Sequence, residues 1–536
     1  MAFLRYVGSF SVSVLCATLA LAQPGGPPPG GGEGPPPGGR GPGGPGGFGQ
    51  PDREILDQFD VDGNGRLDGE EREAARAWVS EQDANRGGGR RRGPRGPGRG
   101  QAAGPLPHQT DDAMTLDPNE VPHYPEADLY DTGVVRTLFF EFEDEHWYDQ
   151  LVAFYHSDIE VPARMVVDGE EVGEVGVRFR GNSSFMAAKK SMNISIDAFE
   201  NGLRLDGFKT LNLLNANGDA SMMREALYAH ISNQYMPAPR ANFVRVVING
   251  RYWGTYVNVE QINKDFIEHH YDTRAGVRWK VPADFSGRGG LVWHGDELAP
   301  YESAYELKTG SAGEDDWRDL IELCRLLKET PAQELPEVLP EVLDVEEALW
   351  FLALDNVLMD QDGYYSRGSD YGLYKDPAGR FHLLTYDNNE AFMVGRGGPG
   401  GFGGPGGRRG PGGRGGLRNG PEGGGAAAMR DPLEHADNPD RPLIHALLSV
   451  PEWRATYLEH VAQINREWMD WQHIGPVVER YRELIEEAVA QDPLGPGAAG
   501  FGDAIAGDEA RSLQGFFNAR HESLLNHPAL NDAQQH

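Results

Sequence analysis

Apolar residues follow two different spacings along this chain, one in its first half and another towards its end. The runs GEVGVRFRG, MNISID, KTLNLLN, FVRVVING and YWGTYVNVE, between residues 173 and 260, predict strands. One predicted helix, SMMREALYAHISNQY at 221–235, interrupts them. Later, apolar residues at helical spacing in 442–468 and 474–492 predict further helices. Strands first and helices afterwards indicate an α+β fold with a sheet-rich N-lobe and a helical C-lobe.

Residues 371–387 predict a β-hairpin that gathers acidic side chains. Two short strand-like runs, YGLYKD and RFHLLTYD, are joined by the turn sequence DPAG. This geometry brings Asp362 and Asp370, on one side of the first strand, towards Asp387 at the end of the second. Clustered carboxylates must raise their pKa values or bind a cation. Phosphoryl transfer uses such acids to orient the acceptor hydroxyl and to hold Mg²⁺ on the nucleotide phosphates. Capped turns in an inactive lobe are the alternative.

Gly-rich tracts divide the chain into parts. Two of them are expected to be disordered linkers, because their composition cannot form a packed core, and a third is expected to be a surface insertion. The second linker is arginine-rich, and a solvated linker is favoured over an RNA-binding tail. The expected parts are a signal peptide (1–22), a linker (23–50), an EF-hand (51–83), a linker (84–110), a core domain (111–394), the insertion (395–428) and a helical remainder of the core domain (429–536).

The N-terminus predicts export. One positive charge at Arg5, an apolar run and the small residues ALA before Gln23 are typical of a cleaved secretory signal. A membrane anchor is the weaker alternative, because the apolar run is short. No second apolar run is long enough to span a bilayer, so no transmembrane segment is expected in the mature chain, which would lie in a periplasm, at the cell surface or outside the cell. Cys324 is then the remaining cysteine, which excludes an intramolecular disulfide.

The charge balance restricts the ligands. The 536 residues include 82 Asp and Glu against 49 Lys and Arg, a formal net charge of -33. An anionic surface repels nucleic acid and anionic lipid, so no nucleic-acid partner is expected. The natural ligands are expected to be cations, or anions delivered together with cations.

The sequence DVDGNGRLDGEE, which starts at Asp60, predicts a calcium-binding EF-hand. Gly65 stands at the sharp turn, Leu67 at the hydrophobic position of the loop, and helical sequence flanks the loop on both sides. Ca²⁺ takes about seven oxygens, which a loop of this spacing supplies. A solvated acidic turn is the alternative. A second hand is absent from the sequence, which predicts weaker binding and a structural or docking role. The predicted ligands are Asp60, Asp62, Asn64, Arg66 through its carbonyl, Asp68 and Glu71.

A set of motifs between residues 138 and 392 resembles the spore coat protein H (CotH) kinase-like family. The matching segments, in chain order, are VRFRGNSS, KKSMNISID, LNLLNANGDASMMREALYAHI, GTYVNVEQINKDFIEHHY, YELKTG, NVLMDQDGYYS, YGLYKD and HLLTYDNNEAF. The resemblance implies an atypical protein-kinase-like, two-lobed fold. It also implies that the protein binds ATP with Mg²⁺ or Mn²⁺ and phosphorylates serine or threonine of a protein acceptor.

The resemblance also implies roles for single residues. Asp362 matches the family's catalytic Asp and Asp387 its metal-binding Asp. Lys190 would pair with the nucleotide phosphates, Arg180 lies close by in the RGNSS loop, and Glu260 falls where the family keeps an acid of the nucleotide pocket. Lys280 and Lys308 are further candidates for that pocket.

Two departures from the family pattern bear on the metal site. Asp370 stands where the family often has Asn, and Asn389 replaces the second acid of a D-x-D ending. The Asn389 side chain can still provide an oxygen ligand for Mg²⁺, and Asp370 supplies the negative charge that the second acid would have carried. The metal site can therefore be retained with the two residue types exchanged. The competing hypothesis is a non-catalytic, calcium-binding cell-envelope or surface protein that uses the kinase-like fold as a scaffold. An extracellular hydrolase lacks a convincing nucleophile with its base.

Overall fold

The structure is a computed structural model. The predicted signal peptide, the linker 23–50, most of the linker 84–110 and the predicted insertion lie outside the residues that it describes. In the described part, no helix has the length and apolar character needed to cross a membrane. The described residues are 53–86, 106, 114–181, 183–284, 286–309, 312–393, 429–507 and 511–533.

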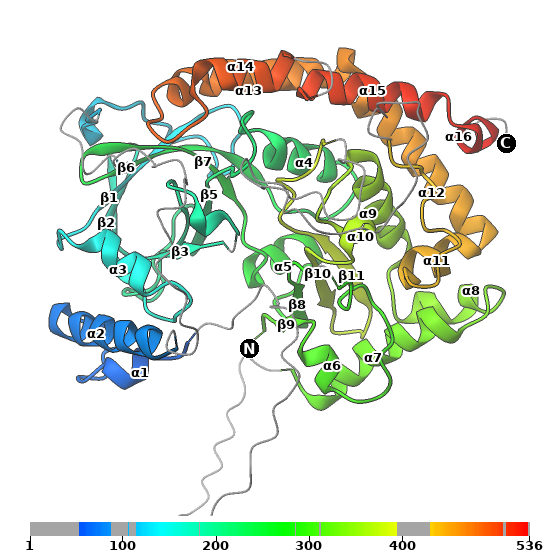
Figure 1. Cartoon of the computed structure of the whole chain (residues 1–536), viewed down its shortest axis with the longest axis horizontal. Helices are drawn as coiled ribbons and strands as arrows, with labels where there is room; N and C mark the ends of the chain where they lie inside the picture. The colour runs from blue at the N-terminus through cyan, green and yellow to red at the C-terminus, as the bar shows by residue number, and fades with distance from the viewer. Residues whose placement is uncertain are drawn as a thin grey trace, which may run out of the picture. The chain divides into compact units, whose positions relative to one another are not determined.

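The first half of the chain forms a closed barrel (Figure 1). The order of its strands is β1-β2-β3-β4-β5-β7-β6, and neighbours are antiparallel except for β1 and β6, which are parallel. Alternate residues such as Val175 and Val177 of β3 and Val244 and Val246 of β6 fill the interior. The strands are β1 (Arg136–Glu141), β2 (Val161–Val167), β3 (Glu170–Arg180), β4 (Ser191–Ser195), β5 (Thr210–Leu214), β6 (Ala241–Ile248) and β7 (Arg251–Val259).

A helix–loop–helix precedes the barrel and shares its core. It consists of α1 (Leu56–Phe59) and α2 (Gly69–Arg86), and α2 packs against α3 (Trp147–Ala153). Leu67, in the loop, is 2% exposed and belongs to the same apolar cluster as the barrel interior. The Asp158 carboxylate accepts hydrogen bonds from the first backbone N–H groups of this module, including Leu56 at 3.1 Å. The barrel therefore covers the apolar face of this helix–loop–helix.

A second sheet, in the order β11-β10-β8-β9, follows the barrel. Its strands are β8 (Val277–Val281), β9 (Glu306–Leu307), β10 (Tyr371–Lys375) and β11 (Phe381–Thr385). The pairing of β10 with β11 confirms the predicted hairpin. The helices and turns around this sheet and the barrel are η3 (Pro118–Glu120), η4 (Ser183–Met186), α4 (Arg224–Ser232), α5 (Lys264–Tyr271), α6 (Ala299–Glu302), α7 (Glu314–Glu329), α8 (Leu335–Val338), η5 (Leu339–Glu341), α9 (Val345–Leu358) and α10 (Tyr364–Arg367).

The C-terminal part is helical, as predicted, and ties the two sheets together. Lys189, before β4, forms a buried ion pair of 2.7 Å with Asp492, after the long helix α13. Arg520 of α15 is fully buried and donates to the carbonyl oxygens of Asn356 and Val357 in α9. The helices are α11 (Pro442–Ser449), α12 (Pro451–Ile464), η6 (Asn465–Met469), α13 (Trp471–Ala490), α14 (Gly497–Ala506), α15 (Leu513–Leu525) and α16 (Pro528–Ala533).

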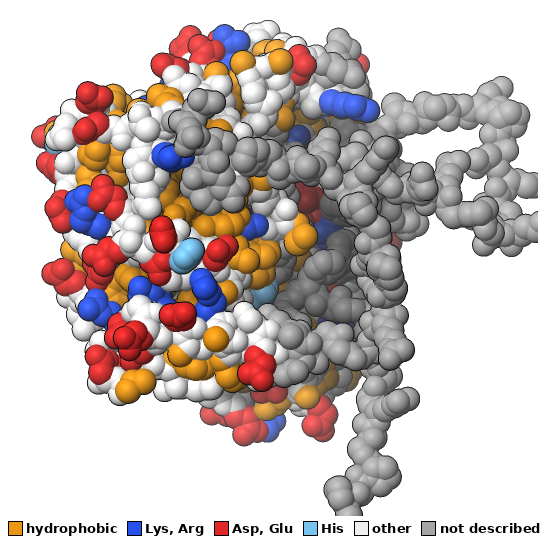
Figure 2. Space-filling model, turned by 60° about the vertical axis from the view of Figure 1, so that its left-hand side comes forward, with side chains coloured by type: hydrophobic (Ala, Val, Ile, Leu, Met, Phe, Trp, Pro, Cys, Tyr) orange, Lys and Arg blue, Asp and Glu red, His pale blue; other side chains and the backbone are white. Residues whose placement is uncertain are grey.

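The arrangement confirms a mixed helix and sheet architecture with a helical C-terminal region. Two strands of the barrel, β1 and β2, lie outside the runs that predicted strands. Figure 2 shows acidic side chains spread over the visible face, consistent with the net charge of -33.

Candidate functional site

The acidic residues of the predicted hairpin meet at its open end. The register of β10 and β11 pairs Tyr371 with Thr385, so the residue before β10 lies beside those that follow β11. Asp370 and Asp387 occupy these positions, and both have left-handed backbone conformations, with φ of 51° and 58°. Such conformations are uncommon outside Gly and Asn, and they cluster at functional sites. The chain therefore turns sharply on both sides of the acid cluster.

A short segment after α9 adds two more acids. Asp360 is 1% exposed, and its carboxylate accepts hydrogen bonds from the Asp362 backbone N–H at 3.0 Å and from the Asn388 side chain at 2.8 Å. Asp362 forms an ion pair with Arg367 at the end of α10. These contacts fix both acids relative to the turn after β11.

Burial and mutual repulsion perturb this cluster strongly. Burial, with repulsion from Asp355, raises the pKa of Asp360 to about 7. Burial, with repulsion from Glu390, raises the pKa of Asp362 to about 7 although Arg367 opposes it. Burial and the neighbouring Asp387 raise the pKa of Asp370 to about 9. A site that holds carboxylates at such values is built for a cation or for proton transfer.

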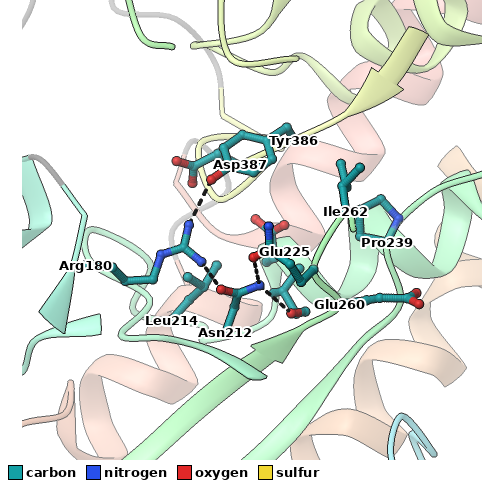
Figure 3. Close-up of a pocket in the computed structure, with 11 residues that line it drawn as sticks. Arg180, Asn212, Leu214, Glu225, Pro239, Glu260, Ile262, Tyr386 and Asp387 are labelled. Carbon is teal, nitrogen blue, oxygen red and sulfur yellow. Dashed lines mark hydrogen bonds between the residues drawn. The ribbon is translucent and has the colours of Figure 1, made fainter. Parts of the chain in front are cut away.

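One cationic side chain, Arg180, lines a pocket together with the acids Glu225, Glu260 and Asp387 (Figure 3). The Arg180 guanidinium donates to the Tyr386 hydroxyl at 2.8 Å and to the side-chain oxygen of Asn212. The Lys280 ammonium donates to the same hydroxyl at 3.2 Å and lies 4.4 Å from the centre of the Tyr386 ring. Burial would raise the pKa of Tyr386, but Lys280 and Arg180 outweigh it and the pKa is lowered. Two cations thus meet at the Tyr386 hydroxyl, next to Asp387 in the chain.

The structure brings most of the predicted site residues together. Arg180, Glu260 and Asp387 line the pocket. The Glu260 carboxylate is held by the Arg240 guanidinium at 3.0 and 2.8 Å, an ion pair that explains its burial without a ligand. Asn389 lies in the turn after β11, two residues beyond Asp387.

Two predicted lysines lie apart from the pocket lining. The Lys190 ammonium donates to the carbonyl oxygens of Phe185 at 2.6 Å and Ala187 at 3.1 Å, so it holds the loop that follows β3. Lys308 pairs with Glu306 at 2.9 Å. Lys280 does not line the pocket either, but of the candidate lysines it is the one that contacts Tyr386 and acts electrostatically on Asp370.

Three polar groups of the pocket region escaped the prediction from sequence. Asn212 joins Arg180 to Gln261, to which its amide donates at 2.7 Å. Glu225 of α4 lines the pocket, and the buried Asp360 is close enough to repel its carboxylate. The only sequence signal for Asp360 was its place in MDQDG, and Glu225 reads as an ordinary residue of an amphipathic helix.

The donor set fits a hard divalent cation such as Mg²⁺ or Mn²⁺. All of the acids offer oxygen, and the Glu225 Oε2 atom is buried without a hydrogen-bond partner in the described part of the chain. The carboxylates do not converge as tightly as the two groups of three that lie within 4.8 Å of one another, Asp60 with Asp62 and Glu71, and Asp344 with Glu347 and His382. Asp387, Asn389 and Asp370 are the residues that would hold the ion.

The second of those tight groups serves the fold. The His382 ring bonds to Glu347 at 3.0 Å, and the Tyr271 hydroxyl donates to the other oxygen of Glu347 at 2.9 Å. The Asp344 carboxylate caps α9 by accepting from the Glu347 backbone N–H. These bonds satisfy the three side chains without a metal.

The loop between α1 and α2 brings three of the predicted calcium ligands together, because carboxylate oxygens of Asp60, Asp62 and Glu71 lie within 4.8 Å of one another. The Asp60 carboxylate accepts from the backbone N–H groups of Gly63 at 2.8 Å and Gly65 at 2.7 Å. Gly65 has φ of 79°, which gives the sharp turn. The Glu71 carboxylate closes the loop by accepting from the Val61 N–H at 2.8 Å. The other predicted ligands, Asn64, the Arg66 carbonyl and Asp68, stay predictions.

We expect the metal-free protein to lose stability as the pH rises. Folded-state pKa values of about 7 for Asp362 and about 9 for Asp370 lie above the ordinary value of 3.8, so the folded state holds more protons than the unfolded state in this range. The stabilisation is complete at about pH 4 and is lost by about pH 9. Thermal unfolding in a chelator measures this slope. Asp370→Asn should flatten it, Asp376→Asn at the far end of the hairpin should leave it unchanged, and equal slopes in both variants would contradict the expectation.

Comparison with known proteins assigns the chain to a class. The family model described as CotH kinase protein matches residues 177–524, from β3 to α15. The chain belongs to this family, as the motifs predicted. The matched range contains Arg180, Lys280, Asp362 and Asp387, and leaves the helix–loop–helix outside.

Among individual proteins, the chain is similar to fungal invasins and to a bacterial spore coat protein. Invasin CotH2 of Rhizopus delemar is 24% identical over 290 residues, 50% of this chain and 46% of that protein. Invasin CotH3 of the same fungus is 24% identical over 227 residues, 40% and 36%. Inner spore coat protein H of Bacillus subtilis is 25% identical over 234 residues, 43% and 62%. The chain therefore spans less than two thirds of the length of each of these relatives.

Proposed function

We propose that this protein is an exported atypical kinase that transfers phosphate from ATP to serine or threonine of a protein acceptor. The observation that carries the proposal is that Arg180, which lines a pocket with Asp387, and Lys280 of the neighbouring sheet both donate to the hydroxyl of Tyr386, the residue before Asp387. Phosphoryl transfer needs cations for the phosphates and acids for the metal and for the acceptor hydroxyl, held in a fixed arrangement. On this proposal the barrel and the second sheet with its helices correspond to the two lobes of a kinase-like fold.

Each group has a chemical role in the proposal. Asp387, with Asn389 or Asp370, holds Mg²⁺ or Mn²⁺, which neutralises charge on the transferred phosphate. Asp362 orients the acceptor hydroxyl and takes its proton; a pKa of about 7 suits a general base near neutral pH. Arg180 and Lys280 bind the phosphates.

Lys280 takes the role that the sequence resemblance gave to Lys190. We expect Lys280→Met to weaken metal-dependent ATP binding by about tenfold or more, because a charge-assisted hydrogen bond to phosphate contributes about 1.5–3 kcal/mol. Lys190→Met should leave ATP affinity much less affected, since the Lys190 ammonium is already engaged by backbone carbonyls. Calorimetric titration of ATP in Mn²⁺ measures both. A large loss in Lys190→Met with none in Lys280→Met would reverse the assignment.

Location at a cell surface or outside the cell is part of the same proposal. The relatives are an inner spore coat protein and two invasins, by their names surface-associated proteins. The predicted signal peptide points the same way.

A calcium-binding surface protein without transferase activity is the second candidate function. It is favoured by the convergence of Asp60, Asp62 and Glu71 within 4.8 Å and by the burial of Leu67 in the barrel core. The calcium ligands in this proposal are Asp60, Asp62, Asn64, the Arg66 carbonyl, Asp68 and Glu71. Calcium binding by a parent protein that fails to bind ATP would select this candidate.

A further inference from the structure

Glu225 is a buried acid of the pocket with one oxygen unused. It is the second residue of α4 and is 7% exposed. The nearby Asn388 backbone N–H favours the charged form of its carboxylate, whereas Oε2 has no hydrogen-bond partner in the described part of the chain. A buried polar atom without a partner costs about 1–3 kcal/mol, and more when it is charged. Such an atom calls for an explanation.

The charges around Glu225 increase that cost. Asp387 and Asp360 both repel its carboxylate, and burial together with this repulsion raises its pKa well above the ordinary value. Arg180 is the opposing cation, but its guanidinium is already engaged by Tyr386 and Asn212. Acidic side chains therefore surround Glu225, and in the described part of the chain no cationic side chain forms an ion pair with it.

Glu260, in the same pocket, shows how the fold treats a buried acid that has a structural role. Its carboxylate receives two side-chain hydrogen bonds and a backbone hydrogen bond, all from Arg240. Both residues line the pocket and both are buried. The contrast indicates that Glu225 Oε2 is kept open for an occupant that supplies positive charge.

We propose that Glu225 is a ligand, through Oε2, of the divalent cation that Asp387 binds. This inference rests on the metal site of the proposed function and adds a residue to it. Glu225 would bind the ion from α4, which comes between the barrel strands β5 and β6 in the sequence. Asp387 follows β11 of the second sheet. The cation thus links the barrel side of the pocket to the hairpin side.

The surrounding contacts fix Glu225 in this position. The Asp219 carboxylate accepts from the Arg224 backbone N–H at 2.9 Å and so fixes the start of α4. Asp360 accepts from the Asn388 side chain at 2.8 Å, and the nearby Asn388 backbone N–H in turn favours the charged form of Glu225. Asp360 is therefore a positioning residue for the proposed ligand.

The variant Glu225→Gln separates a metal ligand from a structural residue. It keeps the shape of the side chain and removes a negative charge that faces two other acids. A ligand role predicts that the metal-free protein melts at the same or a higher temperature, because repulsion is relieved. It also predicts that stabilisation by Mn²⁺ is largely lost. A structural role predicts a lower melting temperature with Mn²⁺ affinity retained.

The test is a titration of the full chain with Mn²⁺ alone. The electron paramagnetic resonance signal of the free ion measures how much Mn²⁺ stays unbound at each step. Every protein carries Glu71→Gln, which disables the calcium loop and leaves the core site. We expect the Glu71→Gln background to bind, Asp387→Asn to abolish binding, and Glu225→Gln to weaken it by about tenfold or more. Glu160→Gln is the matched control, a largely buried acid of the barrel that accepts from Ser195, and it should bind like the background.

The outcomes distinguish this inference from the proposed function. Mn²⁺ binding that depends on Glu225 in a protein that does not bind ATP would support the ligand role and reject the kinase. Equal affinity in Glu225→Gln and the background would overturn the ligand role even if ATP binds. Absence of Mn²⁺ binding from the background would overturn it as well.

Discussion

Asp362→Asn is expected to lower the rate of phosphate transfer by about a hundredfold to ten-thousandfold and to leave metal-dependent ATP binding intact. The amide keeps the shape and can still contact Arg367, but it cannot take the proton of the acceptor hydroxyl. Because the Arg367 guanidinium already pairs with Asp362, the loss of this charge should change the affinity for the cation little. Initial rates with labelled ATP and an acceptor protein, beside calorimetric ATP titration, measure the two effects separately.

Asp376→Asn is the matched control for that experiment. Asp376 lies in the turn of the same hairpin, where its carboxylate accepts from the Arg380 backbone N–H at 2.8 Å, a bond that Asn can also accept. Transfer by this variant should equal that of the parent. If Asp362→Asn transfers phosphate as fast as the parent, Asp362 is not the base.

Calcium is expected to raise the melting temperature of the whole barrel, and Glu71→Gln to abolish that rise. Leu67 and the helix residues Ala75 and Val79 are buried in the barrel core, so the barrel cannot unfold without disrupting the loop. A lone extracellular hand with a Kd of about 0.1–1 mM is about 90–99% saturated at about 10 mM calcium. The resulting stabilisation of about 1.4–2.7 kcal/mol corresponds to a rise of several degrees.

Glu70→Gln controls for the charge change. Glu70 is the exposed neighbour of Glu71, and its backbone N–H, not its carboxylate, contacts Asp68. This variant should keep the full response to calcium in differential scanning calorimetry. A response that persists in Glu71→Gln, or one confined to a separate minor transition, would show that the loop is not the calcium site coupled to the barrel.

Local sequence was sufficient for the features that depend on neighbouring residues. The hairpin of Tyr371–Lys375 and Phe381–Thr385 follows from two short runs and a DPAG turn, and its register alone brings Asp370 to Asp387. The spacing of acids in the loop from Asp60 to Glu71 likewise brings Asp60, Asp62 and Glu71 together. In both cases the spacing along the chain fixes the spacing in space.

Features that depend on contacts between distant parts of the chain could not be predicted from local sequence. Strand β1 is buried along most of its length, so it lacks the alternation that marks a half-exposed strand, and it closes the barrel by pairing with β6 about a hundred residues later. Lys190 and Lys280 both lie at strands, and only the fold shows that Lys190 points to carbonyls of its own loop. Glu225 became a pocket residue because α4 packs beside the turn after β11, which no local pattern records.

On the proposed function, the acids at the open end of the hairpin form a metal-dependent nucleotide site. A calorimetric titration of ATP into the purified protein with Mg²⁺ or Mn²⁺, beside Asp387→Asn and beside a metal-free sample, tests this site. We expect saturable binding by the parent that disappears both without metal and in Asp387→Asn. Absence of binding by the parent, or equal binding by Asp387→Asn, would contradict it.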